Sequence, residues 1–333
     1  MAAVRTIAVT NQKGGVGKTT TVANLGAALA RRRINTCLID LDPQAHLTMH
    51  FGIDRAALPL SIYDVIIGRV PLGRAAILAE PNLTVVPSVI GLAGAEVELA
   101  GQVGREQILR DRIQAQNLPY ELILIDCPPS LGLLTLNALT AAEEVYIPLQ
   151  PHFLALQGLG GLLETVSLVR KRINPDLTVG GLILCMYESG TRLAAEVTED
   201  VRRFFDAARG GASPWSSARV FQTQIRRNIK LAECPSHGTT IFRYEPSSHG
   251  AADYAALADE FVALFASQGE PFATAEAPQA NLAEAASGPD AGVYVTTARQ
   301  AAPPEAAGPA EPDSRPADQE RAGDEAPAAG AGS

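Results

Sequence analysis

The sequence is poor in cysteine and has no long apolar run. Its four cysteines, Cys37, Cys127, Cys185 and Cys234, are scattered without metal-ligand or paired spacing, which is typical of small buried side chains in a reducing compartment. No stretch of about 18 consecutive apolar residues occurs, so we predict no transmembrane helix. A strand-like segment begins within the first few residues, and we therefore expect no signal peptide. These absences favour a cytoplasmic protein.

The net charge of −9 is concentrated at one end of the chain. From Ser267 onward the chain contains 11 of its 36 acidic residues and 3 of its 27 basic residues. The rest of the chain is therefore almost neutral, and any anion-binding surface on it must be a local patch. The same end is rich in Ala, Pro, Glu and Gly, a composition that cannot offset the entropy lost on folding. We predict a folded domain over residues 1–266 and a disordered tail over residues 267–333.

Short apolar runs alternate with longer helix-like stretches in the folded part. Several runs are continuously apolar, such as Leu122-Ile123-Leu124-Ile125, as in strands that are buried on both faces. This rhythm predicts an α/β fold with a doubly wound, mainly parallel sheet and helices on both faces. The expected strands are Thr6–Thr10, Thr36–Asp40, Leu83–Pro87, Leu122–Asp126, Glu144–Leu149, Val179–Met186 and Val220–Ile225, and the expected helices lie near residues 18–32, 104–116, 153–172, 192–207 and 251–266.

A glycine-rich segment lies between the first expected strand and the first expected helix. It reads Asn11-Gln12-Lys13-Gly14-Gly15-Val16-Gly17-Lys18-Thr19-Thr20. Glycines let backbone N–H groups curl around phosphate oxygens, and the N-terminus of the helix adds partial positive charge. In such a loop Lys18 contacts the β- and γ-phosphates and the Thr19 hydroxyl binds Mg²⁺. The segment therefore predicts a P-loop nucleotide site that comprises Lys13, Gly14, Gly15, Val16, Gly17, Lys18, Thr19 and Thr20.

This loop departs from the standard pattern G-x-x-x-x-G-K-[ST] in one place. Gln12 stands where the first glycine is usual, and Lys13 precedes the glycines. The run resembles the deviant Walker A signature of the ParA/MinD family, which also includes the nitrogenase iron protein and the arsenite-pump ATPases. The resemblance implies a P-loop NTPase fold and a Lys13 that crosses a dimer interface to the partner's nucleotide, where it neutralises charge on the transferred phosphoryl group. A lysine solvated on the loop surface is the alternative.

Aspartates end two of the expected strands, at the edge of the sheet where α/β proteins bind ligands. Asp40 and Asp42 belong to a D-x-D-P-Q motif that the family shares. The resemblance implies that Asp42 orients or deprotonates the attacking water and that Asp40 supports the metal site; a turn-capping carboxylate is the alternative for each. Asp126 follows four apolar residues in the Walker B pattern and is expected to hold Mg²⁺, usually through water. In relatives the D-x-P-P segment that begins there senses the γ-phosphate.

The segment after the last expected strand resembles chromosomal ParA proteins of the Soj type. It reads Ile225-Arg226-Arg227-Asn228-Ile229-Lys230-Leu231-Ala232-Glu233-Cys234-Pro235-Ser236-His237-Gly238. The resemblance, which covers roughly residues 4–266, implies that Asn228 contacts the base of ATP and that basic side chains here bind DNA. The candidates are Arg226, Arg227 and Lys230, with Arg192 and Arg219 as an extension. Such contacts with phosphates do not depend on base sequence. The alternative is that these basic side chains are ordinary solvated charges on the surface of a helix and do not bind DNA.

Other branches of the family fit the residues less well. The cysteines do not stand in the context of the cluster ligands of nitrogenase iron protein. A MinD-like membrane anchor requires a basic amphipathic helix, whereas the polar side of residues 251–266 carries Asp253, Asp259 and Glu260. A metabolic P-loop enzyme similar to dethiobiotin synthetase would not need Lys13 in trans. We therefore expect the last helix to pack on the domain rather than on a membrane.

The sequence as a whole predicts an ATPase that forms a homodimer with ATP and binds nonspecific DNA. Its cofactors are expected to be ATP and Mg²⁺, and its catalytic residues Lys13, Lys18 and Asp42. A ParB-like protein and DNA are expected to stimulate slow hydrolysis and so to drive chromosome or plasmid partitioning in the cytoplasm, at the nucleoid. A MinD-like positioning ATPase on a membrane and a partitioning ATPase for a cargo other than DNA are the alternatives.

Overall fold

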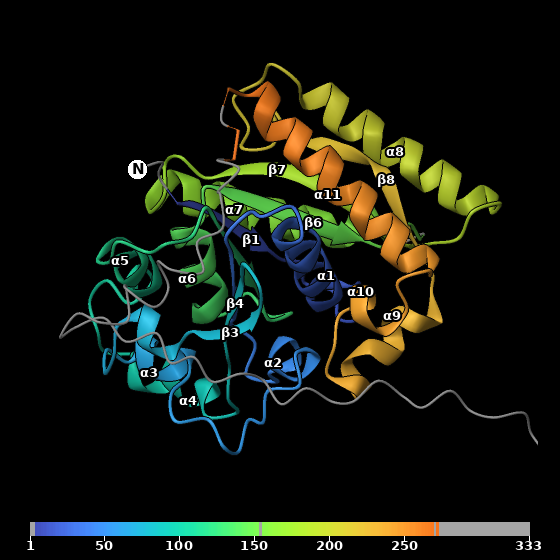
Figure 1. Cartoon of the computed structure of the whole chain (residues 1–333). Helices are drawn as coiled ribbons and strands as arrows, with labels where there is room; N and C mark the ends of the chain where they lie inside the picture. Colours follow the sequence, from blue (N-terminus) through green and yellow to red (C-terminus); the bar gives the residue numbers. More distant parts are fainter. Residues whose placement is uncertain (1–3, 153–154, 270, 273–333) are drawn as a thin grey trace, which may run out of the picture. The chain divides into compact units, whose positions relative to one another are not determined.

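The computed structural model describes residues 4–152, 155–269 and 271–272 (Figure 1). One mixed sheet contains all the strands of this part of the chain, in the order β3-β4-β2-β5-β1-β6-β7-β8. The strands are β1 (Arg5–Val9), β2 (Thr36–Asp40), β3 (Ile77–Glu80), β4 (Leu83–Val86), β5 (Leu122–Asp126), β6 (Glu144–Leu149), β7 (Thr178–Tyr187) and β8 (Arg219–Arg226).

The expected doubly wound parallel sheet is confirmed. All seven expected strands form, within a residue or two of their predicted ends, and each neighbouring pair among them is parallel. The sequence analysis missed β3, which pairs antiparallel with β4 across a tight turn in which Asn82 has φ 60°. A four-residue edge strand is too short to show an alternating pattern, because only its first residue is buried.

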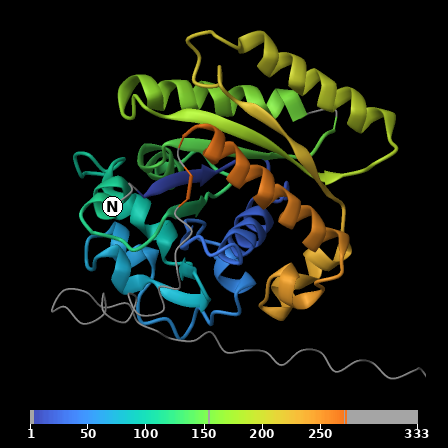
Figure 2. The ribbon, with the colours of Figure 1, turned by 45° about the horizontal axis from the view of Figure 1, so that its top comes forward.

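Helices cover both faces of the sheet (Figure 2). The helices are α1 (Lys18–Ala30), α2 (His46–His50), α3 (Ile62–Ile66), α4 (Leu92–Glu98), α5 (Ile108–Gln114), α6 (Leu133–Ala141), α7 (Ala155–Arg172), α8 (Arg192–Ala208), α9 (Ile229–Glu233), α10 (Ile241–Tyr244) and α11 (His249–Ser267), with 3₁₀ turns η1 (Leu72–Ala75) and η2 (Cys234–His237). The five expected helices are present, although α5 begins four residues later than expected. The helices that were not predicted have nine residues or fewer, which is too short for a clear periodic pattern.

Successive residues of the central strands enter two separate cores. On β1, Ile7 packs with α1 and α11, and Ala8 packs with helices on the other face. On β5, Leu124 and Ile125 divide in the same way. This alternation follows from the period of two along a strand. Because both faces are apolar, the central strands read as continuous hydrophobic runs.

The last helix lies across the sheet next to α1. Its side chains Tyr254, Leu257, Phe261, Leu264 and Phe265 are buried in the same core as α1. On its polar side, Asp253 and Glu260 accept backbone N–H groups of β8, and Asp259 pairs with Arg32 at 2.6 Å. The expectation that this helix packs on the domain is therefore confirmed.

The remaining expectations about the chain concern membranes, cysteines and the tail. Among the described residues, no helix combines the length and the apolar character needed to cross a bilayer. The four cysteines are free and buried. The predicted tail over 267–333 lies outside the described residues except at its start, where α11 continues to Ser267 and Phe272 packs against the core. The predicted domain boundary stays a prediction.

Candidate nucleotide-binding site

The glycine-rich segment lies at the carboxyl end of β1, in the middle of the sheet. The chain passes from β1 to β2 on one side and later to β6 on the other, which makes this end of β1 the point where the strand order reverses. Ligands of doubly wound sheets bind at such a point, because adjacent connections diverge there and leave a crevice. The expected segment therefore occupies the position in the fold where a phosphate ligand is most easily held.

Two glycines give the loop its curvature. Gly15 and Gly17 adopt φ of 70° and 94°, values that favour glycine, and Gly17 is the N-cap of α1. Asn11 fixes the loop at both sides: its side-chain amide donates to the Pro148 carbonyl at 2.7 Å, and its oxygen accepts from the Lys13 N–H at 3.0 Å. Asn11 had no predicted role, although it lies only two residues before Lys13.

The two lysines of the loop lie in different environments. Lys18 is buried, and its ammonium donates to the backbone carbonyl of Lys13 at 3.0 Å. Burial lowers the pKa of Lys18, and the Asp126 carboxylate is the strongest of the groups that oppose this shift. The Lys13 side chain is exposed, and its ammonium contacts the ring of His152, just after β6. One lysine is therefore directed into the site and the other lies on its surface.

Asp126 has the properties of a ligand to a hydrated cation. It is fully buried at the end of β5, and neither carboxylate oxygen has a hydrogen-bond partner within the described residues. Burial, followed by the nearby Asp40, raises its pKa well above the ordinary value; Thr19 and Lys18 are close enough to oppose that rise. Two orphaned buried oxygens beside a threonine hydroxyl match the oxygen ligands that Mg²⁺ prefers. The residues present thus fit the magnesium ion.

Mg²⁺ does not require more protein ligands than these. It usually binds one or two carboxylates, substrate phosphates and several waters. No group of three or more His, Cys, Asp or Glu side chains suitable for a metal ion occurs in the described part of the chain. A preformed cage is therefore absent there, and the ion would be shared between Thr19, Asp126 and the phosphates of ATP.

Asp40 differs from Asp126 because its carboxylate is already hydrogen-bonded. Its Oδ2 accepts from the Thr48 hydroxyl at 2.6 Å and from the Thr48 N–H at 2.8 Å, while Oδ1 accepts from the Asp42 N–H at 3.2 Å. Burial raises the pKa of Asp40 to about 7, against the effect of these donors. These contacts favour the turn-capping alternative, and support of the metal by Asp40 stays a prediction. The contact between Thr48 and Asp40 could not be predicted from the sequence, since the two residues are eight positions apart and belong to no common motif.

Only one of the two carboxylate oxygens of Asp42 accepts a hydrogen bond within the described residues. Its Oδ1 accepts from the Gln44 N–H at 2.9 Å, and its side chain is 8% exposed. Oδ2 accepts no hydrogen bond within the described residues. An oxygen that is fixed in orientation and free to accept a proton is suited to hold a water molecule, so the expected role in catalysis remains open to Asp42.

The candidate residues for DNA and base contacts do not all lie together, because Arg219 is separated from the others. Arg226 forms a salt bridge with Asp253 at 2.5 Å, Arg227 with Glu188 at 3.0 Å, and Lys230 with Glu233 at 3.0 Å. Arg192 is exposed at the start of α8. Arg219 begins β8 and Arg226 ends it, so the two lie about 23 Å apart along the strand.

Asn228 has a local structural role. Its side-chain oxygen accepts from the Lys230 N–H at 2.8 Å and so caps the short helix α9. Its side-chain amide is not used by that bond. Contact between Asn228 and the base of ATP stays a prediction.

A phosphate loop at the switch point of this sheet, with a buried aspartate on the neighbouring strand, defines a P-loop nucleoside triphosphatase. The sequence profile of a family described as an AAA domain matches residues 4–179. The sporulation initiation inhibitor protein Soj of Bacillus subtilis is 44% identical over 260 residues, which make up 77% of this chain and 98% of that protein. The chromosome partitioning protein ParA of Myxococcus xanthus is 43% identical over 262 residues, 78% of this chain and 88% of that protein. The chain belongs to the ParA/MinD family of P-loop ATPases.

Solved structures agree with this assignment. The cobyrinic acid a,c-diamide synthase from Mycobacterium smegmatis, solved with a bound ATP analogue and magnesium, is 36% identical with a TM-score of 0.67, and the match covers 81% of this chain and 100% of that one. The septum site-determining protein MinD of Pyrococcus horikoshii, complexed with Mg-ADP, has a TM-score of 0.60 at 24% identity, and covers 78% and 96% of the two chains. At that identity the likeness shows the fold alone.

Proposed function

We propose that this protein is a partitioning ATPase whose ATP-bound form is a homodimer that binds nonspecific DNA. The observation that carries the proposal is the contrast between Lys18, buried in its own loop, and Lys13, exposed at the surface of the same loop. The names of two relatives, the chromosome partitioning protein ParA of Myxococcus xanthus and the chromosome-partitioning ATPase Soj of Treponema pallidum, support partitioning as the process that the ATPase serves.

ATP and Mg²⁺ are the cofactors of this activity. The loop from Lys13 to Thr20 binds the phosphates through its N–H groups, and Lys18 moves from the Lys13 carbonyl to the β- and γ-phosphates. Thr19 and Asp126 would hold Mg²⁺, which would supply positive charge to offset the negative charge of the phosphates. Asp42 aligns the attacking water through its free oxygen. Lys13 of each subunit reaches the nucleotide of the partner, where an added cation stabilises the transition state.

Dimerisation gives the DNA-binding surface its strength. Four basic side chains near the carboxyl ends of β7 and β8 form the DNA-binding cluster of one subunit: Arg192, Arg226, Arg227 and Lys230. Each subunit of the dimer contributes one such cluster, which binds DNA weakly by itself. Two clusters held together bind a phosphate backbone more tightly than either alone. Arg219 remains a candidate for DNA, although it lies at the other end of β8. A ParB-like protein would stimulate hydrolysis and so release the dimer from the nucleoid.

Sedimentation velocity with a non-hydrolysable ATP analogue and Mg²⁺ tests the proposal. We expect the protein to be monomeric without nucleotide and dimeric with it, and to bind duplex DNA of unrelated sequences only in the dimeric state. A protein that stays monomeric with the analogue bound would contradict the proposal. ATP-dependent sedimentation with anionic liposomes, without DNA binding, would instead support the MinD-like alternative.

A further inference from the structure

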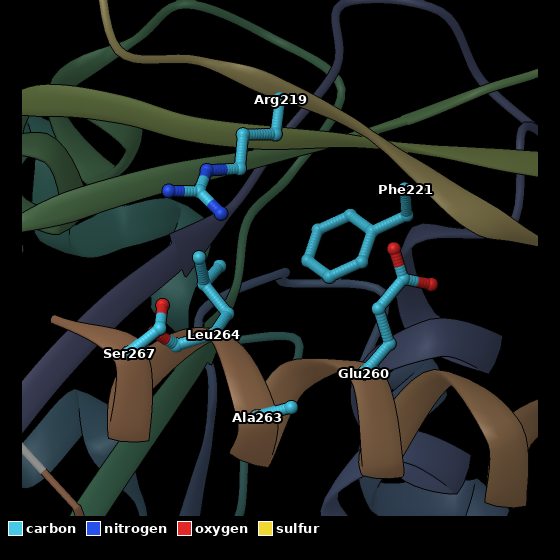
Figure 3. A pocket seen from close by; sticks show the side chains of 6 residues that line it. All are labelled: Arg219, Phe221, Glu260, Ala263, Leu264 and Ser267. Atoms are coloured by element: carbon cyan, nitrogen blue, oxygen red, sulfur yellow. The ribbon is translucent and has the colours of Figure 1, made fainter.

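A groove lies between the edge strand β8 and the last turns of α11, and no residue of the phosphate loop lines it (Figure 3). Its volume is about 240 Å³, and it is lined by Arg219, Phe221, Glu260, Ala263, Leu264 and Ser267. An apolar cavity of about 150 Å³ accommodates benzene. The groove is therefore large enough for one aromatic side chain.

The groove has an apolar floor and a cation at its rim. In Figure 3 the Phe221 ring and the Leu264 side chain face each other across the gap, and Arg219 extends over Leu264. Arg219 is exposed and forms no ion pair within the described residues; Glu144 is the acidic group close enough to interact with it electrostatically. The Glu260 carboxylate is already bonded to the Gln222 and Thr223 N–H groups. The cation at the rim thus forms no direct ion pair in the described part of the chain, although Glu144 acts on it at longer range.

The chain itself leaves the domain beside this groove. Ser267 ends α11 and lines the groove, and the Phe272 ring packs 5.3 Å from Phe265 and 6.5 Å from Phe261. Sixty-one further residues follow Phe272. A segment that follows Phe272 closely in the sequence is therefore tethered to this part of the domain, which gives it a higher effective concentration at the groove than a separate molecule in solution would have.

The composition of the tail provides one segment that matches the groove. Tyr294 is the only aromatic residue in the sequence after Phe272, and it stands between Val293 and Val295; Asp290 precedes it by four residues. About 20 residues link Phe272 to this segment, and a flexible link of that length spans roughly 25 Å. The segment thus combines an aromatic ring, a carboxylate four residues before it and a link long enough to reach the groove.

We propose that the groove binds residues 290–295 of the same chain, with the Tyr294 ring between Phe221 and Leu264 and the Asp290 carboxylate paired with Arg219. The contact is intramolecular and reversible. It anchors the acidic tail at the amino end of β8, away from the nucleotide site and from Arg226. This binding site requires neither ATP nor DNA, so its test is independent of the proposed function.

Hydrogen–deuterium exchange of the full-length, nucleotide-free protein tests the proposal. We expect amides of residues 290–296 to exchange about threefold or more slowly than those of residues 274–280. Tyr294→Ala should abolish this difference, and Tyr294→Phe should keep it because the ring remains. Leu282→Ala is the matched control, since it removes another large apolar side chain of the tail, and it should change nothing. Circular dichroism and thermal unfolding of the three variants check that the described domain stays folded, so that loss of folding cannot imitate the result.

The ion pair is tested by a charge exchange. Asp290→Arg should weaken the protection, and Arg219→Asp combined with it should restore the protection. Equal exchange of the two tail segments in the wild-type protein would overturn the proposal. So would protection that survives Tyr294→Ala, or protection that increases with protein concentration, because the latter would identify the occupant as a second molecule.

Discussion

The ammonium group of Lys18 lies 3.0 Å from the backbone carbonyl of Lys13 and donates a hydrogen bond to it. The loop is thus closed by its own buried lysine. Exchange of this carbonyl for a phosphate oxygen replaces a neutral acceptor with a charged one, which forms a stronger hydrogen bond. The loop is therefore prepared for a triphosphate, and its two lysines must have separable effects.

Lys18→Ala should abolish nucleotide binding. The substitution removes a buried cation from the phosphate loop, and loss of one partner of a buried charge pair weakens affinity by about 30-fold or more. Isothermal titration with ATP and Mg²⁺ measures the effect. ATP affinity within a factor of two of the wild type would show that Lys18 does not contact the phosphates.

Lys13→Ala should separate binding from assembly. The side chain is exposed in the single chain, so each subunit should still bind ATP with nearly unchanged affinity. We expect loss of the ATP-dependent dimer and a fall in turnover of about 1,000-fold, as when an arginine finger is removed. Sedimentation velocity and a phosphate-release assay on the same preparation measure both. A Lys13→Ala protein that dimerises normally would show that this lysine is only solvated.

Asp42→Ala should block turnover and leave ATP-dependent DNA binding intact. Removal of a group that positions or deprotonates water costs about 100-fold or more in turnover. Asp54→Ala is the matched control: Asp54 also accepts the N–H two residues later, from Ala56 at 3.0 Å, but in an exposed loop. If both variants lost activity equally, the effect of Asp42 would be that of its turn and not of catalysis.

His50 should make the protein sensitive to acid. Its ring is fully buried, neither nitrogen has a partner within the described residues, and burial lowers its pKa to about 4. Since the unfolded chain binds this proton near pH 6.5, the stability that neutral His50 contributes is complete above pH 6.5 and is lost as the pH falls towards 4. The loss is up to about 3 kcal/mol.

His50→Leu should remove that part of the acid sensitivity. Urea unfolding at pH 7.0, 6.0 and 5.0 measures it, and the variant should lose less free energy of unfolding than the wild type between pH 7 and 5. His46→Leu, at an exposed position in the same helix, should leave the wild-type pH dependence unchanged. Equal pH dependence in wild type and His50→Leu would contradict the assignment.

Arg227→Ala should weaken DNA binding without changing ATP binding. Arg227 is 75% exposed and pairs with Glu188. Loss of one phosphate contact lowers the slope of log affinity against log salt by about one unit. Fluorescence anisotropy of labelled duplex DNA over a range of salt concentrations measures it. Arg203→Ala is the control, because Arg203 is exposed and paired with Asp200 on α8.

The sequence determined the sheet and the phosphate loop because their signals are local. Runs such as Leu122–Ile125 are apolar at every position since both faces of the sheet are covered, and that pattern is visible without coordinates. The loop was equally visible: positive φ at Gly15 and Gly17 restricts those positions to glycine. The edge strand β3 gave no such signal, because a four-residue strand with one buried residue follows no period.

Only the tertiary structure decided how the charged side chains are used. Asp40 and Asp126 each end a strand, yet Thr48 donates two hydrogen bonds to the Asp40 carboxylate, whereas the Asp126 carboxylate has only the nearby Thr19 hydroxyl as a donor group and no hydrogen bond of normal geometry in the described chain. Arg226 and Arg219 are close in sequence, yet one is paired with Asp253 and the other lies at the far end of β8. Hydrogen bonds and ion pairs act over a few ångströms, so their partners are set by the packing of elements that are distant in the chain.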